Sequence, residues 1–278
     1  MDKILQGKVA VVTGGGGVLG GAFAKELARV GAKVAIVNRT EEKAKRVADA
    51  ITAAGGVALA VPCDVLDKAA VKKAADIIKE KLGPCDILIN AAGGNNPTAT
   101  SAKEVMKPSA ENPLQGTFFD LKAEGFDAVF QLNFMGTFIP TQIFAEQMIG
   151  RSGATVINIS SMGAYHPLTK VAAYCAAKAA VNNFTEWLAV HLAETGIRVN
   201  AIAPGFFLTE QNRTLLTNSD GSYTERAKKI VAHTPMGRFG DPQDLLGALL
   251  WLSDEKASGF ITGIVVPVDG GFNAYAGV

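Results

Sequence analysis

The chain has 278 residues, of which 48% are hydrophobic and 19% are charged, so it can bury a substantial core. Its formal net charge of +1 gives no electrostatic reason to expect nucleic acid or an acidic membrane as a partner. No apolar run reaches the roughly 18 residues of a membrane span, and the opening residues 1–6 are too short and polar for a secretory signal. Cys63, Cys85 and Cys175 show no metal-ligand spacing, so we expect reduced thiols, no bound metal and a cytoplasmic location.

Short apolar runs typical of buried strands alternate with segments of helical periodicity along the chain. The strand-like runs are residues 8–13, 33–37, 57–61, 86–90, 156–159, 197–202 and 263–267. The helical segments lie at about 19–30, 41–54, 67–82, 126–148, 172–193 and 244–252. This alternation predicts a parallel sheet with helices on both faces. Right-handed crossovers then give a doubly wound, seven-stranded α/β fold, which we expect to form a single domain over residues 1–278.

Two segments interrupt the alternation, at about 94–121 and 206–234. The first is rich in Asn, Pro, Thr and Ser, and the second contains a predicted short helix at 224–231. Long loops in compact domains are usually functional or disordered. Because both follow the C-terminal ends of strands, we expect both to overhang the ligand side as a lid or substrate wall. The alternative for the first segment is a contact between subunits or a surface excursion.

A serine, a tyrosine and a lysine stand out around the fifth strand and the helix that follows it. Ser161 lies at the end of the strand, where open parallel sheets bind their ligands. Tyr174 and Lys178 are four residues apart, so they share one face of a helix. A nearby ammonium lowers the pKa of a phenol, which can then exchange a proton with a carbonyl or alkoxide oxygen held by the serine. The same spacing also arises by chance, so it needs support from its context.

The turn after the first strand is rich in glycine, from Thr13 to Gly20. Glycines let the backbone turn sharply and approach a pyrophosphate, whose charge suits the N-terminus of the next helix. Asn38 and Arg39 end the second strand, where NAD sites usually place an acidic residue. Arg39 is suited to a 2′-phosphate, so we expect NADP, with NAD as the alternative. Asp64, after the third strand, either accepts a hydrogen bond from adenine or caps the next helix.

With these motifs in order, nearly the whole chain resembles the short-chain dehydrogenase/reductase family, which has a Rossmann fold. The turn matches the family's Thr-Gly-x-x-x-Gly-x-Gly pattern except at Val18, where the family has glycine. Residues 90–93 resemble its Asn-Asn-Ala-Gly motif, and Pro204, Gly205 and Thr209 match the segment that holds the nicotinamide. The residues that would bind the dinucleotide are Thr13, Gly14, Gly16, Gly17, Val18, Leu19, Gly20, Asn38, Arg39, Asp64, Val65, Asn90, Ala91, Ala92, Gly93, Tyr174, Lys178, Pro204, Gly205, Phe207 and Thr209.

The resemblance also implies catalytic roles. Tyr174 would be the general acid in reduction and the base in oxidation. Lys178 would lower the pKa of Tyr174 and hold the nicotinamide ribose, and Ser161 would orient the substrate oxygen. Asn133 falls on the family's catalytic helix asparagine and would hold a water that links Lys178 to solvent. The structural alternative for Asn133 is an amide that fills a helix kink.

Residues 93–97, 167–170 and 203–213 resemble the D-mannonate oxidoreductase, or fructuronate reductase, branch of the family. A polar substrate such as a sugar acid would suit these loops, with Lys170 or Arg213 pairing with its carboxylate. The predicted substrate residues are Asn95, Asn96, Ser161, Gly163, Lys170, Gln211 and Asn212. The alternatives are a 3-oxoacyl-carrier-protein reductase, another keto-alcohol reductase, or a nucleotide-binding sensor without catalysis. The resemblance also implies a homotetramer, in which the helices at 126–148 and 172–193 pack across subunits and Trp187 is a candidate interface residue.

Overall fold

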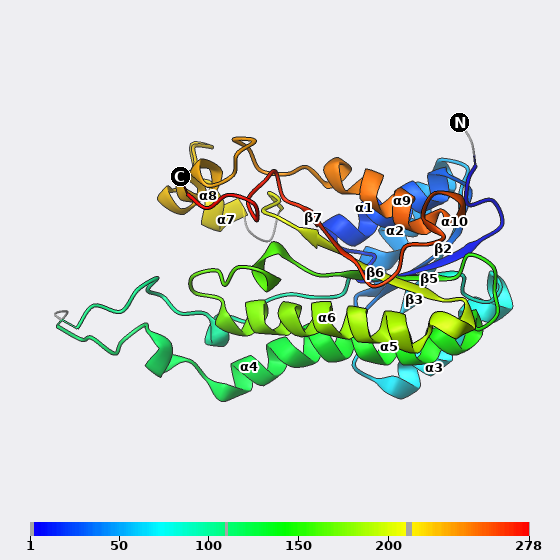
Figure 1. The fold of residues 1–278 in the computed structure, drawn as a ribbon, viewed down its shortest axis with the longest axis horizontal. Coiled ribbons are helices and arrows are strands. Elements are labelled where there is room, and N and C mark those ends of the chain that lie inside the picture. Colours follow the sequence, from blue (N-terminus) through cyan, green and yellow to red (C-terminus); the bar gives the residue numbers. More distant parts are fainter. Residues whose placement is uncertain (1–2, 109–110, 210–212, 278) are drawn as a thin grey trace.

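The computed structural model describes residues 3–108, 111–209 and 213–277. Seven parallel strands form one sheet in the order β3-β2-β1-β4-β5-β6-β7, which confirms the predicted doubly wound Rossmann fold (Figure 1). The strands are β1 Val9–Thr13, β2 Lys33–Asn38, β3 Val57–Pro62, β4 Ile87–Asn90, β5 Thr155–Ile159, β6 Arg198–Pro204 and β7 Val265–Val268. The strand order reverses beside β1, where β4 pairs with the strand's other edge. Such a reversal opens a crevice at the C-terminal ends of the strands.

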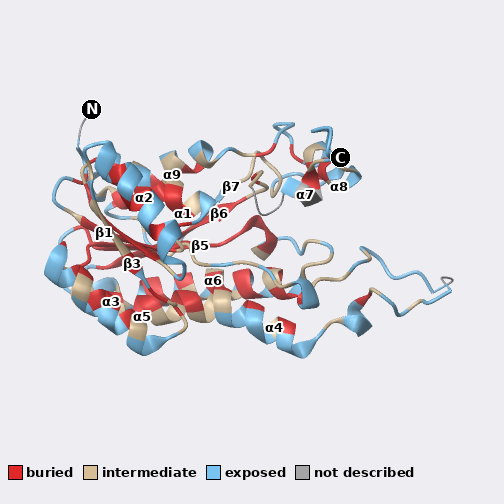
Figure 2. Cartoon of the chain, turned by 180° about the vertical axis from the view of Figure 1, so that it is seen from behind, coloured by how far each residue is buried: buried red, intermediate tan, exposed pale blue. Residues whose placement is uncertain are grey.

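Helices cover both faces of the sheet and create two hydrophobic cores. On one face lie α1 Val18–Arg29, α2 Glu41–Ala53 and α9 Leu246–Ser253, and on the other lie α3 Lys68–Lys81, α5 Gly136–Met148 and α6 Ala172–His191. Alternation along β1 sends Val12 to the first core and Val11 to the second. The helix faces that meet the sheet are buried, and the opposite faces are exposed (Figure 2). No helix in the described ranges is long and apolar enough to cross a membrane.

The helix predicted at 126–148 is interrupted. It begins as α4 Ala123–Phe130, passes through a π-helical turn at Gln131–Met135 and continues as α5. The Asn133 amide donates to the carbonyl of Val129 at 2.8 Å and is therefore part of this turn. A π turn adds a residue to the helix and commonly marks a functional site.

Both insertions lie at the C-terminal edge of the sheet, as predicted. The first forms an arm that projects from the body between β4 and α4 (Figure 1) and carries short 3₁₀ turns at Pro97–Ala99 and Phe118–Asp120. The second contains α7 Arg213–Leu216 and α8 Glu225–Ala232, whose predicted position was 224–231. The remaining short elements are 3₁₀ turns at Met162–Ala164, Ala193–Thr195 and Pro242–Leu245, and α10 Glu255–Ser258.

Candidate active site

The glycine turn after β1 forms a cradle at the N-terminus of α1. Gly14 has a φ of +63°, and a Cβ atom there would lie 2.7 Å from the carbonyl oxygen of Ala91. Only glycine fits both conditions. Gly17 is the N-cap residue and no side chain caps the helix, so the first amides of α1 face the turn without a side-chain acceptor. Free amides at a helix N-terminus suit a phosphate, so this cradle fits the pyrophosphate of a dinucleotide.

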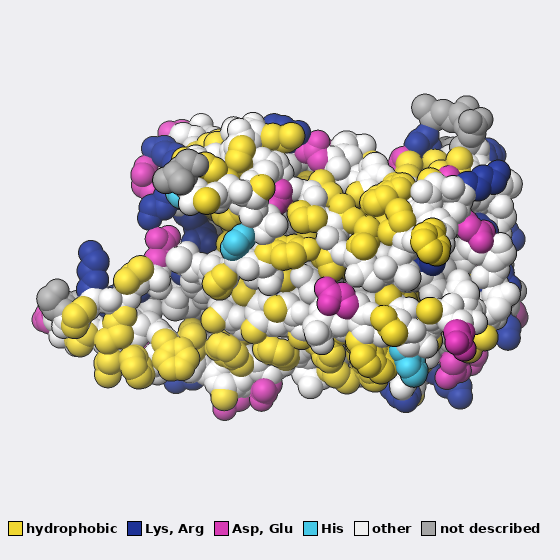
Figure 3. Space-filling view, in the orientation of Figure 1, with side chains coloured by type: hydrophobic (Ala, Val, Ile, Leu, Met, Phe, Trp, Pro, Cys, Tyr) yellow, Lys and Arg dark blue, Asp and Glu magenta, His cyan; other side chains and the backbone are white. Residues whose placement is uncertain are grey.

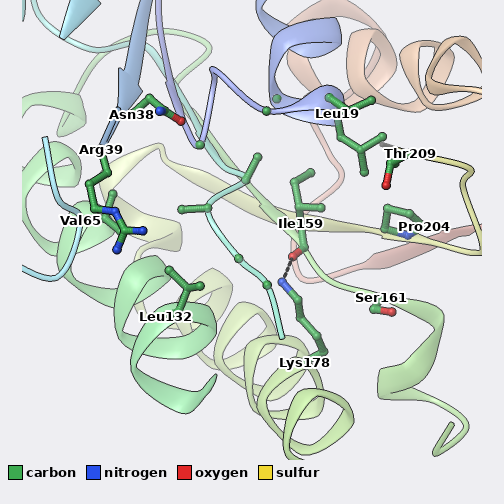
Figure 4. Close-up of a pocket in the computed structure, with 18 of the residues that line it drawn as sticks. Leu19, Asn38, Arg39, Val65, Leu132, Ile159, Ser161, Lys178, Pro204 and Thr209 are labelled. Carbon is green, nitrogen blue, oxygen red and sulfur yellow. Dashed lines mark hydrogen bonds between the residues drawn. The ribbon is translucent and has the colours of Figure 1, made fainter. Parts of the chain in front are cut away.

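A single cleft of about 480 Å³ connects this cradle to Ser161, Tyr174 and Lys178 (Figure 4). Most of the predicted dinucleotide residues line it: Gly14, Gly17, Val18, Leu19, Gly20, Asn38, Arg39, Asp64, Val65, Ala91, Ala92, Gly93, Tyr174, Lys178, Pro204, Gly205, Phe207 and Thr209. The cleft runs along the C-terminal ends of the central strands, from β2 to the start of α6. The cleft therefore connects the cradle that fits a pyrophosphate to the residues predicted for catalysis.

The end of the cleft beside β2 is positively charged. Arg39 and Lys43 both line it, and no acidic side chain follows β2 directly. Asp64 lies nearby and accepts a hydrogen bond from the Leu66 amide at 3.0 Å. The cap of α3 is Asp67, whose carboxylate accepts from two amides of the first turn. Asp64 is thus not the helix cap, and its role at adenine stays a prediction.

Lys178 is buried beside Tyr174, with its Nζ atom 5.7 Å from the ring centroid. The ammonium donates a 2.8 Å hydrogen bond to the carbonyl of Ile159 at the end of β5 (Figure 4). Burial lowers the pKa of Lys178 to about 8. Burial also raises the pKa of Tyr174, while a hydrogen bond between the Ser161 and Tyr174 side chains opposes the rise.

The effect of Lys178 on the pKa of Tyr174 stays a prediction. Burial has the largest effect on that pKa and raises it, and the Lys178 ammonium is directed toward the carbonyl of Ile159. Ser161 also accepts a 3.1 Å hydrogen bond from the amide of Gly163, which fixes its hydroxyl beside the phenol. The serine and the tyrosine can therefore hold one oxygen atom of a ligand between them, and the tyrosine can exchange a proton with it.

Asn133 connects the π turn to the loop after β4. Its amide nitrogen donates to the Gly94 carbonyl at 2.7 Å and its amide oxygen accepts from the Gly94 amide at 3.2 Å. Gly93 lies between Asn133 and Lys178, since a Cβ atom there would be 2.8 Å from the Asn133 oxygen and 3.3 Å from the lysine Nζ. Asn133 thus fixes the wall of the cleft behind the ammonium. Its role in holding a water stays a prediction.

Three residues predicted for the dinucleotide do not line the cleft but shape it. The Thr13 hydroxyl accepts from the amides of Ala91 and Ala92, at 3.1 and 3.3 Å, and so ties β1 to the loop after β4. Gly16 packs against Asn38, because a Cβ atom there would come within 2.9 Å of the asparagine Cγ. The Asn90 side chain is directed into the core. It donates to Thr141 and Asn158 at 2.8 and 2.9 Å.

The predicted substrate residues are only partly brought together. Ser161 lines the cleft, and Gly163 packs beside it against Cys175. The Asn95 amide donates to the Thr100 hydroxyl, and Asn96 caps the turn that follows it, so both asparagines serve the arm rather than the cleft. Lys170 lies in the loop before α6. Gln211 and Asn212 lie outside the described residues.

Some lining residues were not predicted from the sequence. They are Thr40, Lys43, Cys63, Leu66, Gly94, Leu132, Ile159, Ser160 and Phe206. Most of them adjoin a predicted residue in the sequence. Including the sequence neighbours of each predicted residue would therefore have identified most of them. Lys43, in the first turn of α2, and Ile159, at the end of β5, do not adjoin a predicted residue. Cys63 is not a reactive thiol, since burial raises its pKa to about 11.

Comparison with known proteins decides the family. The family model described as short chain dehydrogenase matches residues 8–220. The chain belongs to the short-chain dehydrogenase family. Members of this family are oxidoreductases that use NAD or NADP, and the shape of the cleft is consistent with a site for such a dinucleotide.

Two relatives cover nearly all of this short-chain dehydrogenase. An uncharacterized oxidoreductase named UxuB from Bacillus subtilis is 57% identical over 100% of this chain and 99% of its own. A crystal structure from Haemophilus influenzae, named as a candidate D-mannonate oxidoreductase and holding NAD, is 50% identical with a TM-score of 0.95 and covers 99% of this chain and 98% of its own. The 7α-hydroxysteroid dehydrogenase of Escherichia coli is 33% identical over 96% of this chain and 94% of its own, so the same scaffold also serves a different substrate class.

A nicotinamide dinucleotide bound in this cleft would supply or accept a hydride. The residues of the chain would then act on the oxygen atom and its proton. Ser161 and Tyr174 would bind the oxygen, and Tyr174 would give it a proton during reduction or take one during oxidation. The buried Lys178 ammonium and the Ile159 carbonyl keep this end of the cleft polar although it is shielded from water.

Proposed function

We propose that this enzyme interconverts a ketone and a secondary alcohol on a sugar acid, with NADP(H) as the preferred cofactor. The observation that carries the substrate proposal is the polar character of the two loops beside Ser161 and Tyr174. The amide of Ser101 in the arm donates to the carbonyl of Lys170 at 3.0 Å, so the arm and the loop before α6 form one continuous border. Such a border provides hydroxyl, amide and ammonium groups, whereas a steroid or acyl chain needs apolar walls.

The similarity to known proteins supports the same substrate class. The Haemophilus structure is named as a candidate D-mannonate oxidoreductase, and the identity of 50% extends over the whole of both chains. We take D-mannonate and its keto form, fructuronate, as the first pair to test. The test is a screen of sugar acids and keto-sugar acids with both cofactors, following nicotinamide absorbance. Activity on an acetoacetyl thioester and none on fructuronate would contradict the proposal and indicate a 3-oxoacyl reductase.

The cofactor preference rests on the positive end of the cleft. Arg39 and Lys43 line it. NAD has a neutral ribose hydroxyl at this position, which does not need two cations. Arg39→Ala should raise the KM for NADP by ~10–100-fold and change the KM for NAD by less than ~3-fold, because only NADP carries the 2′-phosphate. Arg46→Ala is the matched control, since Arg46 is an exposed arginine on α2 outside this cleft. Equal losses for both cofactors would contradict a role at the 2′-phosphate.

We further propose that the enzyme is a cytoplasmic homotetramer. Trp187 and Val190 on α6 are 57% and 81% exposed, and Trp187 stacks on Phe184 and His191 in an aromatic row. Apolar side chains also gather on the projecting arm (Figure 3), where Phe118 is 72% exposed. Exposed apolar surface of this extent usually marks a protein contact. Analytical ultracentrifugation that finds a monomer at micromolar concentration would contradict the assembly.

A further inference from the structure

Three segments that are far apart in the sequence meet through polar and charged side chains at the loop before α6, the helix that carries Tyr174 and Lys178. Glu104 of the arm pairs with Lys229 of α8 at 3.0 Å and with Arg226 of the same helix at 3.6 Å. Arg226 also donates to the hydroxyl of Thr169, in the loop before α6, at 3.4 Å. In Figure 3, positively and negatively charged side chains gather at the hollow between the arm and the α7–α8 region.

The positive charges in this cluster exceed the negative charge. Lys170, Arg226 and Lys229 all act on the Glu104 carboxylate and lower its pKa, with Lys229 the largest contributor. Glu225 also acts on Lys229 but is paired with Lys228, so including that pair adds one charge of each sign and the cluster keeps an excess of two positive charges. The contacts of Arg226 are also long for charge-assisted hydrogen bonds, which are usually below about 3 Å. Its guanidinium, which is 27% exposed, can therefore bind a further anion more tightly than its present partners.

The cluster is tied to the catalytic residues through the loop between Ser161 and α6. The amide of Leu168 lies 3.3 Å from the Cys175 sulfur, and Cys175 directly follows Tyr174. Thr169, which contacts Arg226, is the next residue after Leu168. Lys170 follows with a φ of +76°, the only positive φ of a non-glycine residue in the described ranges. Such a backbone conformation costs free energy and is retained mainly where a site requires it.

We propose that Arg226, with Lys229 and Lys170, binds the carboxylate of the substrate, and that Glu104 holds these cations in place when no substrate is bound. This inference rests on the proposed sugar-acid function and identifies the residues that would give it specificity. In a six-carbon acid with its keto group at the fifth carbon, four bonds separate the carboxylate carbon from the reacting carbon, or roughly 5 Å. The loop that holds Lys170 leads directly into α6, which carries Tyr174, so the reacting carbon and the carboxylate of such a substrate would meet neighbouring segments of the chain. Glu104 competes with the substrate carboxylate for the same cations.

A purely structural role is the alternative, since exposed ion pairs often contribute little. The pair of Lys228 and Glu225 shows what such a role looks like, because both side chains are well exposed and the two residues are three apart on one helix. The Glu104 cluster differs because it joins three segments and surrounds a carboxylate with an excess of cations. The two readings predict opposite results for Glu104, which makes them separable.

The test compares D-mannonate with D-mannitol, which has the same carbon chain and a hydroxymethyl group in place of the carboxylate. Binding to the enzyme with its cofactor is measured by titration calorimetry, so the result does not depend on turnover. Arg226→Gln should weaken D-mannonate binding by ~10–100-fold and change D-mannitol binding by less than ~3-fold. Glu104→Gln should strengthen D-mannonate binding by ~3–10-fold, because it removes the competing carboxylate. Lys228→Gln is the matched control and should change neither.

Equal weakening for both ligands in Arg226→Gln, or weaker D-mannonate binding in Glu104→Gln, would overturn the carboxylate role. Thermal unfolding of each variant shows whether a loss reflects folding, and Glu104→Gln remains decisive because a folding defect cannot raise affinity. Turnover of D-mannonate by the unmodified enzyme tests the proposed function separately. Turnover with unchanged binding in both variants would reject only the carboxylate subsite, whereas tight D-mannonate binding without turnover would reject only the proposed reaction.

Discussion

Replacement of Lys178 by methionine measures how far the buried ammonium lowers the free energy of unfolding. Lys178 is 4% exposed, and its pKa is about 8 in the folded chain against an ordinary value of 10.5. Each pKa unit corresponds to about 1.4 kcal/mol, so the charged ammonium destabilises the folded state by about 3 kcal/mol at neutral pH. Loss of its hydrogen bond to the Ile159 carbonyl offsets about 1 kcal/mol of the gain. We expect Lys178→Met to be about 2 kcal/mol more stable at pH 7 and to lose catalytic activity.

The pH dependence of this difference follows from proton binding. Below pH 8, Lys178 is protonated in both the folded and the unfolded chain, so the destabilisation is complete. Between about pH 8 and 10.5 the unfolded chain binds more protons than the folded one, and the stability of the unmodified protein therefore rises with pH. The methionine variant does not become more stable in this way. Its unfolding free energy relative to the unmodified protein should therefore fall by about 3 kcal/mol between about pH 8 and 10.5.

Urea unfolding at pH 7, 8, 9 and 10, followed by circular dichroism, measures the difference directly. The raised pKa of Cys63 makes the fold lose stability as the pH rises toward about 11, but this effect is common to both proteins and cancels. Lys79→Met, which removes an exposed lysine of α3, controls for the general loss of a positive charge. A stability difference that stays constant from pH 7 to 10 would refute the reasoning, because Lys178 would then titrate in the same way in both states.

Two further substitutions test the catalytic and dinucleotide parts of the cleft. Tyr174→Phe should lower kcat by ~10²–10⁴-fold in steady-state assays, since the proton-transferring hydroxyl is lost, while cofactor binding measured by nicotinamide fluorescence weakens far less; normal activity would contradict the enzyme mechanism. Gly14→Ala should destabilise the fold by about 2 kcal/mol and weaken cofactor binding by at least ~10-fold, because its φ is +63° and the new Cβ would lie 2.7 Å from the Ala91 carbonyl. Gly55→Ala, also at positive φ but in open space, should lose about 1 kcal/mol and leave cofactor binding unchanged.

The alternation of strands and helices was predictable because the signals for it are local. Each strand is a short apolar run, and glycines or caps follow within a few residues of each end. The same locality explains why the glycine turn, Tyr174 and Lys178 could be recognised as candidates for the site. Their spacing on one turn or one helix already fixes their relation, and the parallel topology brings Ser161 to the same edge of the sheet.

Features that depend on partners distant in the sequence required the tertiary structure. The π turn at Asn133 could not be foreseen, because the side chain also bonds to Gly94, which lies 39 residues earlier. The directions of the pKa shifts at Tyr174 and Lys178 follow from burial, which the spacing of the two residues does not reveal.

The fold class and the family could be predicted from the residues alone, because they depend on local patterns and on their order. The charged cluster around Glu104 became visible with the three-dimensional arrangement. Glu104 and Lys229 are 125 residues apart, and no periodicity or motif relates them. Their meeting depends on how the arm and α8 pack beside the loop before α6, and packing between distant segments is the information that a single sequence does not display.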